Sequence, residues 1–149
     1  MEAWQIFHKK HPDATLLVAG NVPYKNEFDV DVYNNLNVNF VLTYLSDSDY
    51  INFIATSKCV VLPYTRGTNS GVVYTVISMS VNIITSDIPM FQSNYFLNSG
   101  MMFKNGDVDS LVLVMDAVYK SKKSPKYNIE SYRDNFRGVI VKLYHDLLK

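Results

Sequence analysis

The stretch from residue 60 to residue 73 most constrains how this chain can fold. An apolar run over residues 60–62 stops at Pro63, a polar loop follows, and Ser70-Gly71 precedes apolar residues at helical spacing. This order predicts a buried strand, a loop at its carboxyl end and the amino terminus of a helix. Free backbone N–H groups and the positive end of the helix dipole would then border the loop, which favours a bound anion.

The same alternation of short apolar runs and helical patterns continues along the whole chain. Strands are predicted over residues 14–20, 38–44, 58–62, 82–87 and 100–104. Helices are predicted over residues 2–10, 28–36, 46–57, 71–79, 90–97, 107–123 and 129–148. This alternation indicates an α/β fold with a doubly wound, Rossmann-like parallel sheet, and residues 1–149 read as one domain.

Two local patterns make sharper predictions. Ser46 and Asp49 have the spacing of a capping box, so the helix over residues 46–57 begins there, and its apolar residues are predicted to be core. These apolar residues are Tyr50, Ile51, Phe53 and Ile54. The continuous apolar run over residues 14–20 is typical of a strand buried on both faces.

Composition excludes several classes of function. Lys and Arg together number 14 and balance 14 acidic residues, which argues against a nucleic-acid-binding protein. Cys59 is the single cysteine, which leaves no disulfide framework or metal cluster and predicts a buried, inert thiol in a reducing compartment.

No apolar stretch approaches the ~18 residues of a spanning helix, and no signal-peptide pattern is present, so a cytoplasmic location is expected. The three histidines, His8, His11 and His145, are expected to be solvated or capping groups.

Several stretches together resemble the carboxyl-terminal, donor-binding domain of GT-B glycosyltransferases, in particular the large retaining group classified as family 4. The resemblance covers nearly the whole chain and is carried by residues 11–20 (HPDATLLVAG), 40–53, 55–64, 68–72 (TNSGV), 83–89 (IITSDIP) and by Gly106-Asp107 followed by Leu111. It implies binding of a nucleoside-diphosphate sugar (NDP-sugar) and transfer of a hexose-like sugar to an acceptor hydroxyl in polysaccharide or glycoconjugate biosynthesis. No cofactor and no metal are expected. No catalytic residue can be assigned.

The resemblance also assigns candidate roles to residues of this sequence. The diphosphate is expected at Ser70, Gly71, Val72, Arg66, Asn69 and Thr68. The sugar and ribose are expected near Tyr64, Gly67, Tyr74 and Thr75, and the nucleobase near Tyr44, Leu45 and Gly20. For each position the alternative is a plain structural role, such as a helix cap at Ser70 or a solvated arginine at Arg66.

Two departures from the family pattern weaken the expected activity. Many members carry two glutamates eight positions apart around this loop, and the matching positions here are Gly67 and Thr75, neither of which is acidic. The family domain also starts with a central strand and a basic loop, whereas this sequence starts inside the following helix. The strand at residues 15–19 is therefore expected to pair directly with residues 59–62, or with a strand from another segment or chain.

These departures leave two functional hypotheses from different classes. In the first, the chain is a donor-domain fragment of a glycosyltransferase and is inactive alone. Its partners would be a nucleotide-sugar and a missing amino-terminal acceptor domain or a second copy of the chain, and peripheral membrane association of the full enzyme is compatible with this. In the second, the chain is a degenerate, non-catalytic domain that acts in protein association. An unrelated dinucleotide-binding domain is disfavoured because no Gly-x-Gly-x-x-Gly follows a predicted strand.

Overall fold

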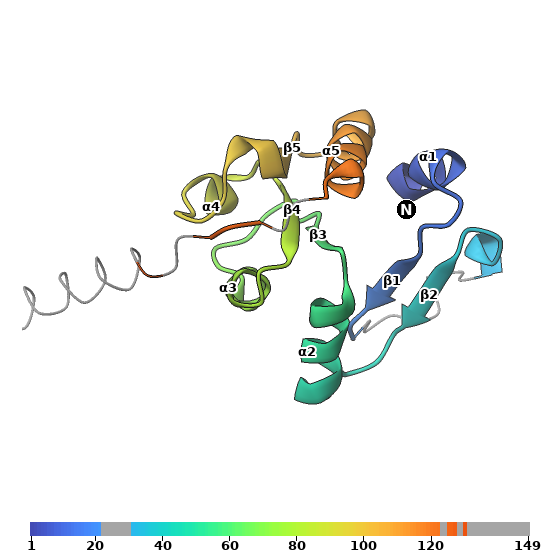
Figure 1. Ribbon diagram of the computed structural model, residues 1–149, viewed down its shortest axis with the longest axis horizontal. Helices are drawn as coiled ribbons and strands as arrows, with labels where there is room; N and C mark the ends of the chain where they lie inside the picture. The colour runs from blue at the N-terminus through green and yellow to red at the C-terminus, as the bar shows by residue number, and fades with distance from the viewer. Residues whose placement is uncertain (22–30, 123–124, 128–129, 131–149) are drawn as a thin grey trace, which may run out of the picture.

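The computed structural model describes residues 1–21, 31–122, 125–127 and 130, and its elements alternate as predicted (Figure 1). The described helices are α1 (Glu2–Lys10), α2 (Asp47–Thr56), α3 (Gly71–Ser78), α4 (Pro89–Gln92) and α5 (Val108–Lys120), with 3-10 turns η2 (Asp31–Tyr33) and η3 (Ser99–Met101). The described strands are β1 (Leu16–Ala19), β2 (Val38–Val41), β3 (Cys59–Leu62), β4 (Asn82–Ser86) and β5 (Met102–Phe103). The predicted helix over residues 129–148 lies outside the described residues except for residue 130, as does the first part of the one over 28–36.

The strands are parallel, as the alternation predicts, but they form two sheets rather than one. β1 pairs with β2, with Leu16 opposite Val38, and β3, β4 and β5 pair in that order. Within the described part of the chain β1 does not pair with β3, so the expected direct closure of these two strands is wrong. β1 and β3 each have only one strand neighbour there, and that leaves one edge of each open.

The open edge changes the burial of β1. Residues 16–18 are only half-buried and Ala19 is exposed, whereas residues 83–86 of β4 are all buried. The prediction that the first strand is buried on both faces is therefore wrong. Within the described residues β1 has β2 as its one strand neighbour, whereas β4 has a strand on each side and helices of the main core packed on it.

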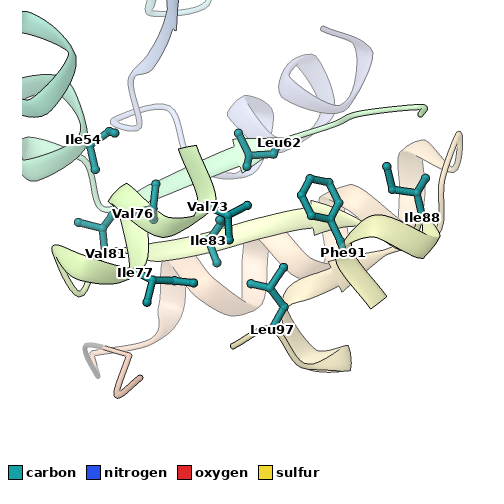
Figure 2. Close-up of a cluster of buried hydrophobic side chains, with 10 residues drawn as sticks. All are labelled: Ile54, Leu62, Val73, Val76, Ile77, Val81, Ile83, Ile88, Phe91 and Leu97. Atoms are coloured by element: carbon teal, nitrogen blue, oxygen red, sulfur yellow. The ribbon is translucent and has the colours of Figure 1, made fainter. Parts of the chain in front are cut away.

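The main core forms where α3 and α4 meet the three-stranded sheet. Figure 2 shows its ten buried side chains, which come from β3, β4, α3, α4 and nearby segments: Ile54, Leu62, Val73, Val76, Ile77, Val81, Ile83, Ile88, Phe91 and Leu97. Val76 and Ile83 are fully buried, and α3 presents three of its residues to this cluster because they recur at helical spacing. The core fixes the position of α3 relative to the end of β3.

A second, aromatic cluster joins α1 to α5, and Figure 1 shows these helices next to each other. Trp4, Phe7 and Ala14 are buried there against Met115 and Tyr119 of α5, among others. The Phe7 and Tyr119 rings meet edge to face with centroids 5.5 Å apart, an arrangement that aromatic pairs prefer. The Trp4 indole N–H donates to the backbone carbonyl of Leu36 at 2.8 Å, so the same cluster also holds the segment before β2.

Helix starts follow the sequence closely. The Ser46 side chain accepts a hydrogen bond from the Asp49 backbone N–H, and the Asp107 carboxylate accepts one from the N–H of Ser110. The cap predicted at Ser46 is confirmed, and Asp107 caps the helix that the sequence predicts from residue 107. The prediction that all four apolar residues of α2 are core is wrong for Ile51, which is 48% exposed, whereas Ile54 is buried.

Candidate functional site

The loop after β3 is anchored at its start by the neighbouring strand and helix. The Ser86 hydroxyl of β4 donates to the backbone carbonyl of Tyr64, and the Tyr64 ring packs against Phe91 of α4 with centroids 5.6 Å apart. These two contacts fix where the chain leaves Pro63. The rest of the loop then leads to Ser70, the N-cap residue of α3.

A cavity of about 150 Å³ lies between this loop, the first turn of α3 and α4. Its lining combines predicted and unpredicted residues: Thr68, Asn69, Ser70, Val73, Tyr74, Met90, Phe91, Ser93 and Asn94. One water needs ~10–15 Å³, so the cavity has room for several waters or for a phosphate group. None of the lining side chains carries a charge at neutral pH, so recognition here depends on hydrogen bonds and the helix end.

Ser70 is the most informative residue of this cavity. Its side chain is buried, the whole residue being 8% exposed, and the Oγ atom has no hydrogen-bond partner among the described residues. Unlike Ser46 and Asp107, Ser70 does not use its side chain to cap its helix. A buried hydroxyl without a partner costs free energy, and Ser70 is one of the residues that line the cavity.

Of the neighbours of Ser70, Asn69 lines the cavity, whereas Gly71 and Val72 lie in the first turn of α3 and do not line it. The Asn69 side-chain carbonyl accepts from the Ser70 backbone N–H at 2.8 Å, so its NH₂ group is the part left to bind a ligand. Gly71 is exposed, and a Cβ built there would meet nothing within 4 Å, which keeps the first turn of α3 open to an approaching group. Val72 is half-buried against the core. This arrangement suits an anion at the start of an eight-residue helix.

Other predicted residues lie in or beside the same loop but do not line the cavity. Arg66 and Gly67 are exposed, and a Cβ at Gly67 would come 3.2 Å from the Met90 sulfur, so this glycine allows a close approach to α4. The Thr75 hydroxyl donates to the Gly71 carbonyl at 3.3 Å and lies within α3. Their roles toward sugar and phosphate stay predictions.

The predicted nucleobase residues lie at the other sheet. Gly20 follows β1, and Tyr44 and Leu45 come after β2, and none of the three lines the cavity. Gly20 has a positive φ of 141°, a backbone conformation that side-chain-bearing residues rarely adopt, and its N–H donates to the Val41 carbonyl. Tyr44 is 85% exposed, so its ring is open to a stacking partner. A nucleobase role for these residues stays a prediction.

The sequence patterns did not identify the part of the cavity lining that α4 and the following turn contribute. Met90, Phe91, Ser93 and Asn94 line the cavity, although they lie more than twenty residues from the loop in sequence. The available signal was the strand ending near residue 87, because the carboxyl ends of neighbouring parallel strands meet at one edge of a sheet. Residues that follow β4 were therefore candidates for the site.

Outside the cavity, three titratable groups have structural roles. Burial raises the pKa of the half-buried Cys59 thiol to about 12, which keeps it a thiol, as predicted for an inert cysteine. The expectation of solvated or capping histidines is confirmed for His11, the C-cap residue of α1, whose backbone N–H donates to the Phe7 and His8 carbonyls, and it is wrong for His8. His11 Nε2 lies 2.6 Å from Asp116 Oδ1, and His8 Nε2 is buried without a partner in the described structure. His145 lies outside the described residues. No group of three His, Cys, Asp or Glu residues that could hold a metal occurs within residues 1–21, 31–122, 125–127 and 130.

Parallel strands that alternate with helices define a Rossmann-like α/β domain. The chain belongs to the family described as Glycosyl transferases group 1, whose model matches residues 1–135. This chain is thus a glycosyltransferase domain with the α/β fold of a GT-B half. No curated protein matches the sequence. Among the described helices, none has the length and apolar character that crossing a membrane requires.

Proposed function

We propose that this chain binds the diphosphate of an NDP-sugar at the amino terminus of α3, as the donor-binding part of a glycosyltransferase. The observation that carries this proposal is Ser70, a cavity-lining residue at a helix start whose hydroxyl is buried and has no hydrogen-bond partner among the described residues. Membership in a glycosyl transfer family supports a sugar nucleotide as the ligand.

The chemical task of this site is to stabilise the leaving diphosphate. Hydrogen-bond donors held in place at the helix end act on the negative charge that grows as the sugar bond breaks. Arg66 is exposed in the same loop, and a guanidinium can bind a phosphate through two parallel hydrogen bonds. Because Gly67 and Thr75 supply no carboxylate, we expect hexosyl transfer by this chain alone to be weak or absent.

Titration of the 149-residue chain with UDP and GDP tests this function. We expect binding in the micromolar range that Ser70→Ala and Arg66→Ala each weaken about tenfold, since each removes a hydrogen bond to a charged group. Ser78→Ala, at the other end of α3, and Lys9→Ala, on α1, are matched controls and should leave binding unchanged. Absence of binding to both nucleotides would contradict the proposal and favour a role in protein association.

A further inference from the structure

We infer that Asn94, which follows α4, is a second phosphate ligand and closes the diphosphate site from the side opposite α3. This inference rests on the proposed function and extends it to an element that is distant in sequence. Asn94 lines the same cavity as Ser70 and Asn69, and it is half-buried. The cavity is thus bordered by asparagine side chains from two separate segments.

The hydrogen bonds of the two asparagines determine what each can offer a ligand. The Asn94 side-chain carbonyl accepts from the Phe96 backbone N–H at 3.0 Å, just as the Asn69 carbonyl accepts from Ser70. Because an amide oxygen that accepts from the backbone leaves the NH₂ group at the other end, both residues present donors. No hydrogen bond of the Asn94 NH₂ group occurs within the part of the chain that the structure describes.

The lining of the cavity therefore includes amide donors and no anionic acceptor. The NH₂ groups of Asn69 and Asn94 and the Ser70 hydroxyl can donate, and no carboxylate lines the cavity. A phosphate group has only acceptor oxygens at neutral pH, so it matches this set better than a ligand that must also donate. Met90 and Phe91 form an apolar wall, which strengthens these hydrogen bonds by limiting water.

The substitution Asn94→Asp tests the donor role directly. An aspartate keeps the side-chain oxygen that accepts from Phe96, so the turn is preserved, but it replaces the NH₂ donor by a negative charge. The matched control is Asn98→Asp, because the Asn98 side-chain carbonyl accepts from the Gly100 N–H in the same way and lines a different cavity. Both variants change the net charge equally.

Binding of inorganic pyrophosphate, UDP and UDP-glucose is measured by calorimetry for the full chain and both variants. We expect Asn94→Asp to weaken pyrophosphate and UDP about tenfold or more, and Asn98→Asp to change them less than about twofold. Equal losses in both variants, or no loss in Asn94→Asp, would overturn the inference. A change confined to UDP-glucose would also overturn it and would assign Asn94 to the sugar.

If the proposed function fails, the pattern of binding across pyrophosphate, UDP and GDP differs from the one above. If pyrophosphate binds in an Asn94-dependent way but UDP and GDP do not, the phosphate ligand stands and the nucleotide-sugar function falls. If pyrophosphate and both nucleotides fail to bind at about 10 mM, both proposals fall. Circular dichroism of each variant shows that the fold is retained.

Discussion

The Ser70 hydroxyl is buried and makes no hydrogen bond within the described residues. Removal of such a group is nearly neutral or stabilising for the fold, whereas removal of a capping hydroxyl costs about 1 kcal/mol. We therefore expect the free energy of unfolding of Ser70→Ala to equal that of the wild type or to be higher by no more than about 1 kcal/mol. Ser46→Ala, which removes the cap of α2, should lose about 1 kcal/mol.

Urea denaturation of the two variants measures this difference. A loss of about 1 kcal/mol or more in Ser70→Ala would show that the hydroxyl is satisfied within the protein, and that would remove the main observation behind the proposed site. A stable but binding-deficient Ser70→Ala would show that this residue serves the ligand rather than the helix.

At the scale of elements, Asp116 of α5 responds to acid, and it contacts Lys120 of the same helix and His11 at the end of α1. Hydrogen bonds from Lys120 and then from His11 lower the pKa of the Asp116 carboxyl below its ordinary value of 3.8. The folded state thus favours the ionised form. As the pH falls through 3.8 the unfolded chain takes up this proton first, so the stabilisation present at neutral pH is lost on further acidification.

We expect Asp116→Asn to be less stable than the wild type at pH 7 and to approach it as the pH falls below 3.8. Thermal unfolding across this pH range measures the effect. Asp109→Asn, at an exposed position of the same helix, is the control and should follow the wild-type pH profile. A constant difference between Asp116→Asn and the wild type at every pH would contradict the assigned hydrogen bonds from Lys120 and His11 to the Asp116 carboxylate.

The elements differ in how far the sequence predicts them. Helix starts depend on local residues such as Ser46 and Asp107, and their positions were predictable because a cap acts within three residues. The partial exposure of Leu17 and the exposure of Ile51 depend on which elements lie alongside, and a local pattern carries no such information. The contribution of Asn94 to the cavity lining was not predicted for the same reason, because its position beside the loop depends on the arrangement of β3, β4 and α4.

At the scale of the whole molecule, the separation of the two sheets has a consequence for how the protein opens. β4 lies between two strands and under the main core, whereas β1 has one strand neighbour within the described residues, and the cluster around Trp4 connects its neighbourhood to α5. The chain should therefore contain two cooperative units of different stability, and β1 with β2 should open without global unfolding.

Native-state hydrogen exchange resolves these units amide by amide. We expect the amides of β1 and β2 to exchange through a smaller opening free energy than those of β4, with Trp4→Ala accelerating them about 100-fold. The β4 amides should change far less, because Trp4 does not contact the main core. Equal acceleration in both sheets would show a single cooperative unit. With two units, the half that carries Tyr44 would open and close while the half that carries Ser70 stays folded.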